Sequence, residues 1–232
     1  MKIYFPLIKA GTGTDTWTYN LAKSLKSLGV DAEIIIYPHK YQFFPDLLGV
    51  FKRDIKADII HANSWNGFVF KKNIPLVVTA HHLVHEQALN KYKSLPQKVF
   101  HKLIYRFENK SFTASNQITC VSDYTKSKLQ EIFGFDSTRI YNGIDVRNFS
   151  PQRAKNVFPA VGKDKTTLLF VGNMTRRKGA DLLPKIMKRL GDKFVLICIS
   201  DSEKNMRKAG DNIYMIDHLS QQRMIEYYKL RG

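Results

Sequence analysis

Short apolar runs alternate with amphipathic stretches along most of this chain. The apolar runs predict strands, and they fall at residues 3–8, 33–37, 58–61, 76–79, 118–121 and 139–141. Stretches with helical spacing of apolar positions lie between them, at residues 14–28, 97–114 and 124–133. Strands that alternate with helices are typical of an α/β fold, in which helices cover both faces of a mostly parallel sheet.

The pattern is interrupted once and then starts again. Residues 148–165 have little periodicity and are rich in charge and in breakers, so they are predicted to be an interdomain linker. Residues 166–232 then carry strand-like runs at 168–171, 194–199 and 213–216, and helical patterns at 181–190 and 221–230. We expect a Rossmann-like domain over residues 1–147. Because three strands make a poor closed domain, the second Rossmann-like domain, over residues 166–232, is expected to be incomplete.

The opening of the second unit carries the strongest chemical signal. Residues 170–179 read Phe-Val-Gly-Asn-Met-Thr-Arg-Arg-Lys-Gly, between a predicted strand and a predicted helix. Three consecutive cations, Arg176, Arg177 and Lys178, at a helix N-terminus predict a site for a phosphate or diphosphate. Taken alone, such a turn is also compatible with a solvated basic surface.

A second glycine loop of matching context, Gly11-Thr12-Gly13, follows the first predicted strand. Glycines between strand and helix let a ligand approach free backbone N–H groups. The loop does not fit an NAD-binding fingerprint, because Thr16 replaces the third glycine and no acid ends the second strand. It is not a Walker loop either, because no Gly-Lys-Ser/Thr follows.

Composition limits the remaining classes. The 232 residues include 37 Lys and Arg against 20 Asp and Glu, a net charge of +17, which favours anionic partners. The basic residues are dispersed and no nucleic-acid-binding motif is present, so nucleic acid is not expected as a partner. No apolar run is long enough to span a bilayer and no signal peptide is recognisable, which favours the cytoplasm. Cys120 and Cys198 lie in apolar runs and are predicted to be buried thiols.

Six stretches, in order, resemble the family-4 retaining glycosyltransferases of the GT-B fold, which pack two Rossmann-like domains across a cleft. They are the Gly11 loop, 58–63 (Asp-Ile-Ile-His-Ala-Asn), 77–82 (Val-Val-Thr-Ala-His-His), 121–126 (Val-Ser-Asp-Tyr-Thr-Lys), 141–145 (Tyr-Asn-Gly-Ile-Asp) and 171–179. The resemblance implies transfer of a sugar, with retention, from a nucleotide-diphosphate-sugar donor to a glycan or lipid-linked acceptor. The donor is a substrate, and neither a cofactor nor a metal is implied. Synthesis of lipopolysaccharide or another cell-envelope polysaccharide, peripherally at the inner face of the membrane, is the expected setting.

The resemblance also implies residue roles. Lys178 is expected to hold the donor diphosphate, with the Gly11-Thr12-Gly13 loop facing the same phosphates. His81 takes the place of the family's active-site histidine, which contacts the donor sugar. The family's arginine after the glycine is Asn173 here, so Arg176 or Arg177 is expected to supply the missing charge.

Two features leave alternatives open. The family's Glu-x7-Glu segment is expected beyond Gly232, so this chain is predicted to be truncated within its donor-binding domain, and its own activity stays open. An inactive half that serves as a binding module, a basic nucleic-acid-binding protein and a sugar-nucleotide epimerase remain as rivals. The histidines at 81, 82 and 85 lack metal-binding order, and His61 is expected to be structural.

The predicted helix at residues 97–114 has features of a membrane-binding surface. Residues 97–110 carry a basic row beside an apolar row, the basic one made of Lys98, Lys102, Arg106 and Lys110. The helix either faces the core with a solvated rim or lies on anionic lipid. An anionic membrane surface is therefore a further expected partner.

Overall fold

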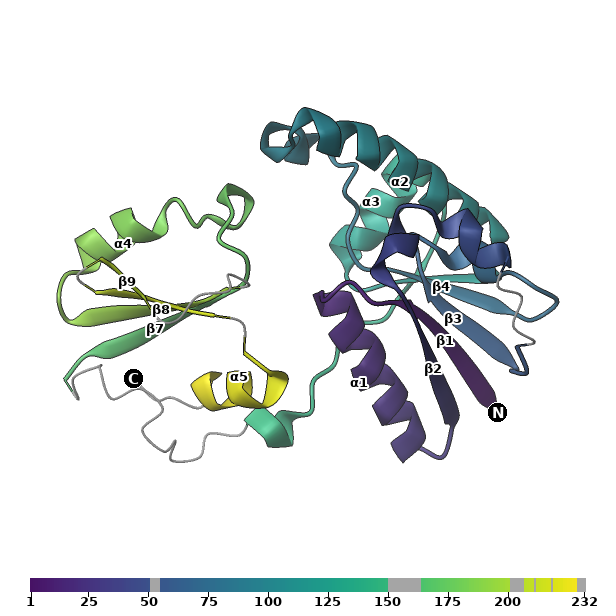
Figure 1. The fold of residues 1–232 in the computed structure, drawn as a ribbon, viewed down its shortest axis with the longest axis horizontal. Coiled ribbons are helices and arrows are strands. Elements are labelled where there is room, and N and C mark those ends of the chain that lie inside the picture. Colours follow the sequence, from purple (N-terminus) through teal and green to yellow (C-terminus); the bar gives the residue numbers. More distant parts are fainter. Residues whose placement is uncertain (51–54, 150–163, 201–206, 211, 218, 229–232) are drawn as a thin grey trace. The chain divides into compact units, whose positions relative to one another are not determined.

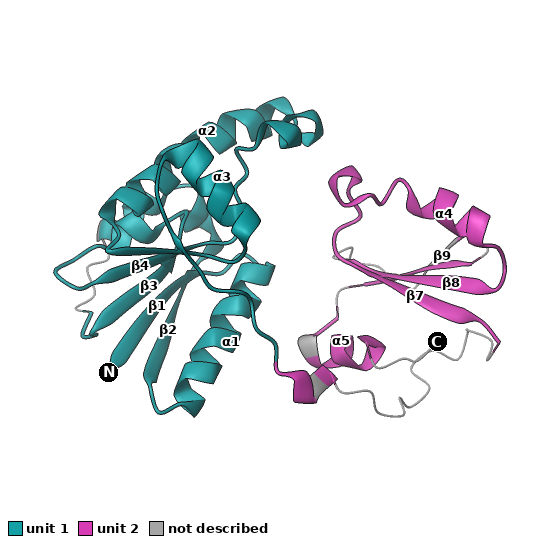
Figure 2. Ribbon diagram, turned by 180° about the vertical axis from the view of Figure 1, so that it is seen from behind, with its two compact units in different colours: residues 1–144 teal, residues 145–232 magenta. Residues whose placement is uncertain are grey.

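The computed structural model describes residues 1–50, 55–149, 164–200, 207–210, 212–217 and 219–228. The chain divides into two compact units, Met1–Ile144 and Asp145–Gly232 (Figure 2). Most of the predicted linker, residues 150–163, lies outside the described residues.

The first unit is built on a parallel sheet of six strands, in the order β2-β1-β3-β4-β5-β6 (Figure 1). The strands are β1 (Lys2–Ile8), β2 (Asp31–Tyr37), β3 (Ile59–Asn63), β4 (Leu76–Ala80), β5 (Gln117–Cys120) and β6 (Thr138–Arg139). The long helices are α1 (Gly13–Ser27), α2 (Leu95–Ala114) and α3 (Asp123–Phe133). Every predicted strand and helix of this unit is present, and the α/β class is confirmed.

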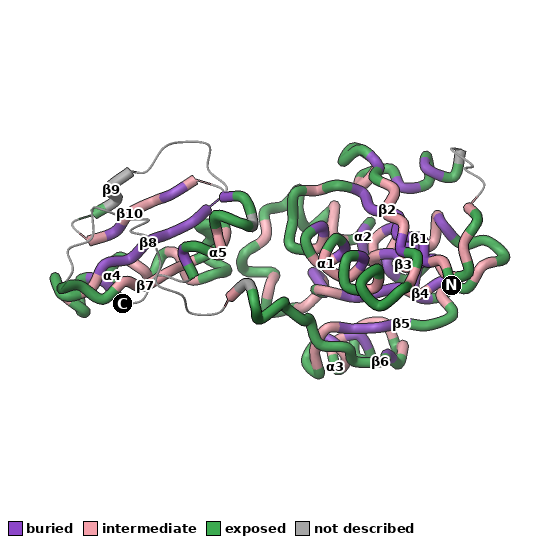
Figure 3. The backbone as a smooth tube through the Cα atoms, turned by 90° about the horizontal axis from the view of Figure 1, so that it is seen from below, coloured by how far each residue is buried: buried purple, intermediate pink, exposed green. Residues whose placement is uncertain are grey.

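Alternation of side chains along β1 separates two cores. Ile3 and Phe5 pack with Ala22 of α1 on one face of the sheet, whereas Tyr4 and Ile8 face the other way, into the cluster that contains Phe112 of α2. Helices α1 and α2 therefore cover opposite faces, and the strands between them form the buried centre of the unit (Figure 3).

Helix boundaries follow local signals. At α2, Ser94 accepts a hydrogen bond from the backbone N–H of Gln97, and the Gln97 side chain accepts one from the Ser94 N–H, which is a capping box. At α3, Ser122 caps the first turn, and Gly134 ends the helix in the left-handed conformation, with φ 77°.

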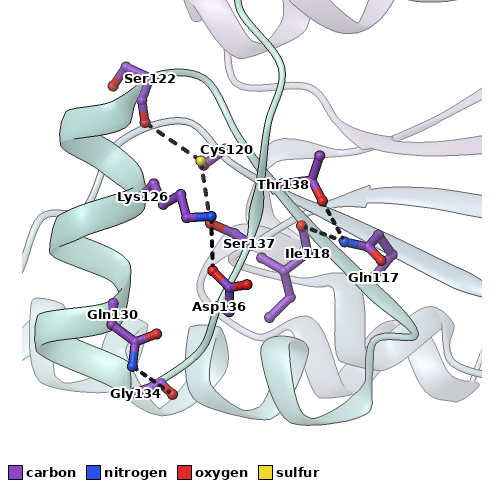
Figure 4. A network of polar contacts seen from close by, with 10 residues as sticks. All are labelled: Gln117, Ile118, Cys120, Ser122, Lys126, Gln130, Gly134, Asp136, Ser137 and Thr138. Atoms are coloured by element: carbon purple, nitrogen blue, oxygen red, sulfur yellow. Dashed lines mark hydrogen bonds and ion pairs between the residues drawn. The ribbon is translucent and has the colours of Figure 1, made fainter.

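The edge of this sheet is tied to α3 by polar contacts (Figure 4). Lys126 pairs with Asp136 at 3.0 Å, and the Ser137 hydroxyl donates to the Cys120 sulfur at 3.3 Å. Cys120 and Cys198 are both buried, and neither is in a disulfide, as predicted from their apolar surroundings.

The second unit contains a four-stranded sheet in the order β7-β8-β10-β9. Its elements are β7 (Thr166–Val171), α4 (Leu183–Leu190), β8 (Phe194–Ile199), β9 (Arg207–Gly210), β10 (Ile213–Ile216) and α5 (Gln221–Tyr228). Met187 of α4 packs on one face of the sheet and Tyr227 of α5 on the other. The expectation of three strands was wrong, because β9 pairs antiparallel with β10 and adds a fourth. The polar sequence of β9 gives no strand periodicity, so only its pairing reveals it.

Candidate functional site

The predicted residues of the first unit lie at one edge of its sheet. The Gly11 loop follows β1 and His81 follows β4, and parallel strands end at the same edge. A side chain from α1 connects the two places: the Trp17 ring lies edge to face against His81, with ring centroids 4.4 Å apart. The same ring lies 5.6 Å from His61. The sequence-based expectation that loop and histidine share an edge therefore matches the structure.

His81 lies in a partly buried, apolar setting. Burial lowers the pKa of its imidazole to about 4, so the ring is neutral near pH 7. Its Nε2 atom is buried and has no hydrogen-bond partner within the part of the chain that the structure describes. A buried polar atom without a partner in the protein is uncommon, and a bound ligand or a water molecule can supply one.

His61, by contrast, is satisfied within the protein. Its Nε2 lies 2.7 Å from the Thr79 hydroxyl, which in turn lies 2.7 Å from the Thr119 hydroxyl. Burial, and secondarily the proximity of His81, lower the pKa of His61 to about 4. This hydrogen-bonded row across β3, β4 and β5 is what a structural histidine requires, in agreement with the sequence-based interpretation.

The Gly11 loop differs from the expected anion cradle. Gly11 has φ 70°, which favours glycine, but its N–H donates to the Asp15 carboxylate at 2.8 Å, and the N–H of Ala10 donates to the same oxygen at 3.0 Å. Gly11 therefore shapes the loop and has no N–H left to offer a phosphate. Within the described residues, the N–H groups of Gly13 and Thr14 have no acceptor, and a Cβ on either Gly11 or Gly13 would meet nothing within 4 Å.

In the second unit, Lys178 lies over the glycine that ends β7. The glycine has φ +136°, a backbone conformation that favours glycine, and a Cβ built on Gly172 would lie 2.5 Å from the Lys178 ammonium, so that the lysine would have to move. No carboxylate lies within ion-pair distance of Lys178 among the described residues. Its ammonium is therefore available to an external anion.

The two arginines of the turn are placed differently from Lys178. The three cations form a short 3-10 turn, Arg176–Lys178, which Gly179 ends with φ 75°. Arg176 lies 3.7 Å from the carboxylate of Asp181, which follows the turn, so its charge is shared with a nearby acid. The helix predicted at residues 181–190 is present, but it begins two residues later than expected: turn bonds from Leu182 to Gly179 and from Leu183 to Ala180 follow the cations, and α4 begins at Leu183.

The helix α2 buries a different row from the one that its sequence suggested. Its buried residues are Ile104, Glu108, Ser111 and Phe112. Val99 is 64% exposed and Leu103 is 40% exposed, beside the basic residues Lys98, Lys102 and Arg106. The core therefore does not use the whole apolar row, and part of it faces solvent next to the cations.

Sequence reasoning missed three residues that shape this region: Trp17, Asp15 and Glu108. Trp17 was recognised only as part of the apolar stripe of α1. Asp15 carries the usual preference for acids in a first helical turn, and that signal could have identified its role. For Glu108, the available signal was an acid placed four residues from both Ile104 and Phe112, inside an otherwise apolar row.

In the regions that the structure describes, no cluster of three His, Cys, Asp or Glu side chains is arranged to hold a metal ion. No helix in those regions is both long and apolar enough to cross a membrane.

Several known proteins resemble this chain. Residues 36–148 match the sequence profile of Glycosyltransferase Family 4. A phosphatidyl-myo-inositol mannosyltransferase of Mycolicibacterium smegmatis is 30% identical over 143 residues, which cover 59% of this chain and 33% of the relative. The protein of the same description from Mycobacterium tuberculosis (strain CDC 1551 / Oshkosh) is 32% identical over 96 residues, 39% of this chain and 25% of the relative.

The match thus spans about a third or less of the length of these curated relatives. Among solved structures, the glycosyltransferase SnogD from Streptomyces nogalater aligns with 94% of this chain and 71% of its own, at 11% identity and a TM-score of 0.46. Residues 36–148, which contain His61, His81 and their strands, therefore resemble Glycosyltransferase Family 4 in sequence.

Proposed function

We propose that the protein transfers a sugar, with retention, from a nucleotide-diphosphate-sugar donor to a glycan or lipid-linked acceptor. The observation that carries the proposal is the Lys178 ammonium, which rests on Gly172 without an acidic partner among the described residues. A fixed cation beside backbone that no side chain covers is suited to the diphosphate of such a donor.

The chemistry needs charge stabilisation more than it needs a base. When the bond to the anomeric carbon breaks, negative charge grows on the departing diphosphate and positive charge on the sugar ring. A cation already aimed at the diphosphate lowers the barrier because it interacts more strongly as that charge develops. In our proposal the departing phosphate takes the proton of the acceptor hydroxyl, so the reaction does not require a pair of catalytic carboxylates.

His81 is proposed to contact the donor sugar through its unpartnered Nε2. A neutral imidazole with one free nitrogen can exchange a hydrogen bond with a sugar hydroxyl, and the low pKa of about 4 keeps it neutral in the working range. The first-turn N–H groups of Gly13 and Thr14 are proposed to bind the donor phosphates, whereas Gly11 acts only through loop shape. Arg176 and Arg177 are proposed as secondary contacts to the diphosphate.

For the acceptor and the sugar, the relatives suggest where to begin. They are named phosphatidyl-myo-inositol mannosyltransferases, so mannose as the sugar and an inositol phospholipid as the acceptor are the first to test. The exposed Val99 and Leu103 beside the basic row of α2 support a lipid-borne acceptor. We propose peripheral association with the cytoplasmic face of a membrane and a role in the synthesis of cell-envelope glycans.

The test is donor binding to this chain, measured by calorimetry against GDP- and UDP-linked sugars. Lys178→Ala should weaken binding about 10-fold or more, since charge-assisted hydrogen bonds contribute about 1.5–3 kcal/mol. Lys185→Ala is the matched control, because it removes the same charge from an exposed position on α4. Equal loss in the two variants would mean that net charge alone attracts the donor, and the site assignment would be wrong.

A transfer assay with radiolabelled donor then distinguishes a transferase from the rivals. Incorporation into lipid supports the proposal. Donor binding without transfer to any acceptor of the panel would favour the binding-module alternative, and interconversion of the free sugar nucleotide would favour an epimerase.

A further inference from the structure

Helix α2 places a carboxylate in the centre of the first unit. Glu108 is fully buried, and both of its oxygens have partners. Oε1 accepts a hydrogen bond from the Ser64 hydroxyl at 2.7 Å, and Oε2 lies 2.7 Å from Nε2 of His85. With the carboxylate oxygen as acceptor, the His85 ring donates from Nε2.

The partners of Glu108 lie where the candidate site lies. Ser64 directly follows β3, and His85 follows β4 by five residues, so both are at the sheet edge that carries His81. A buried carboxylate is costly unless it is fully hydrogen-bonded, and an apolar side chain would fill a core position at lower cost. The polar contact at this edge therefore needs an explanation beyond packing.

The segment from His81 to Glu86 is held at several points. Leu83 and Val84 are buried in the core. The His85 ring packs edge to face against Tyr105 of α2 and Phe133 of α3, at 5.3 and 5.5 Å between ring centroids. Glu86 accepts a hydrogen bond from the Tyr124 hydroxyl. Of these contacts, only the one to Glu108 ties the segment to a buried charged group.

We propose that Glu108 is a positioning residue: by binding His85, it fixes the segment after β4 so that the His81 ring stays against Trp17 at the sheet edge. The assignment of His81 to a donor sugar rests on the proposed function above, but the positioning itself does not. It predicts that breaking the contact between Glu108 and His85 moves the His81 ring without unfolding the unit.

The experiment is NMR of the 232-residue chain labelled in its histidine rings, near neutral pH. His81→Gln assigns the His81 ring signals, and Trp17→Leu shows how far the ring current of Trp17 displaces them. In Glu108→Leu, most of that displacement should be lost, because the apolar side chain cannot accept a hydrogen bond from His85, and the ring is released. Ile104→Val, a buried truncation one turn earlier on α2, is the control for mere loosening of the helix and should leave the signals in place.

His85 provides a second pair of variants if Glu108→Leu does not fold. His85→Ala removes the donor and should displace the His81 signals, whereas His85→Gln retains a side-chain N–H at a similar distance and should restore them. Unchanged His81 signals in folded Glu108→Leu or His85→Ala would overturn the proposal, as would equal displacement in Ile104→Val. If the signals move as expected but His81→Gln leaves donor binding intact, the positioning stands and the proposed role of His81 is rejected.

Discussion

Trp17 and His81 contact each other edge to face at 4.4 Å between ring centroids, which joins the first helix of the chain to the end of the fourth strand. The contact excludes water from one side of the imidazole and leaves Nε2 buried without a partner. Desolvation of this kind disfavours the charged ring and accounts for its lowered pKa. The consequence is a histidine that can form hydrogen bonds near pH 7 but carries no charge.

Stability should depend on pH through His81. Its pKa falls from 6.5 to about 4 on folding, so between these values the unfolded chain binds a proton that the folded chain does not. The free energy of unfolding is therefore not reduced by His81 above pH 6.5. It falls by about 3 kcal/mol in all as the pH decreases from 6.5 toward 4. Chemical denaturation of the wild type and of His81→Gln, followed from pH 7.5 to 4.5, measures the difference; parallel curves would contradict the prediction.

Gly172→Ala should act like the loss of Lys178. The new Cβ would lie 2.5 Å from the ammonium, at a backbone φ of +136° that only glycine adopts readily, so the lysine must move away. Donor binding should fall about as far as in Lys178→Ala, which calorimetry measures. Gly191→Ala is the matched control: Gly191 also has a positive φ, 75°, but nothing lies within 4 Å of the added atom. It should lose about 1–2 kcal/mol of stability and keep its affinity.

Asp15→Asn should loosen the Gly11 loop. The Asp15 carboxylate accepts N–H bonds from Ala10 and Gly11 and lies in the first turn of α1, where negative charge is favoured. Replacing the charged acceptor should cost about 1–3 kcal/mol, read from the denaturation midpoint. Asp31→Asn, at an exposed strand start, is the control and should change stability by less than about 0.5 kcal/mol. An equal loss of stability in both variants would contradict the claim that the Asp15 carboxylate stabilises the Gly11 loop.

Hydrophobic periodicity predicted the first unit well because β1, β4 and β5 are buried on both faces and read as continuous apolar runs. It failed for β9, whose residues, Arg-Lys-Ala-Gly, become a strand only by pairing with β10 at the edge of the sheet. Similarly, the glycine and cation positions were visible in sequence. The folding of Lys178 over Gly172, by contrast, depends on a three-dimensional contact that no spacing rule contains.

For Glu108, the sequence predicts burial but not the hydrogen-bond partners. Helical spacing places Glu108 on the row of Ile104 and Phe112, which predicts that it faces the core. Nothing in that spacing indicates which partners satisfy it. Ser64 and His85 come from two loops that only the strand order β1-β3-β4 brings together.

Binding to anionic vesicles should depend on the basic row of α2. Val99 and Leu103 are exposed beside Lys98, Lys102 and Arg106, so the helix presents apolar and cationic side chains together. Each cation near an anionic surface contributes about 1 kcal/mol, and changing all three to Ser should therefore weaken binding about 100-fold or more in low salt. Sedimentation with vesicles containing phosphatidylserine or phosphatidylinositol measures the loss. A second triple variant, Lys185, Lys188 and Arg189 to Ser on α4, removes the same charge from the other unit and should retain most of the binding. If the two triple variants lose binding equally, the attraction is a property of the net charge of +17 and not of α2. If neither loses it, a membrane-binding role for this helix is ruled out.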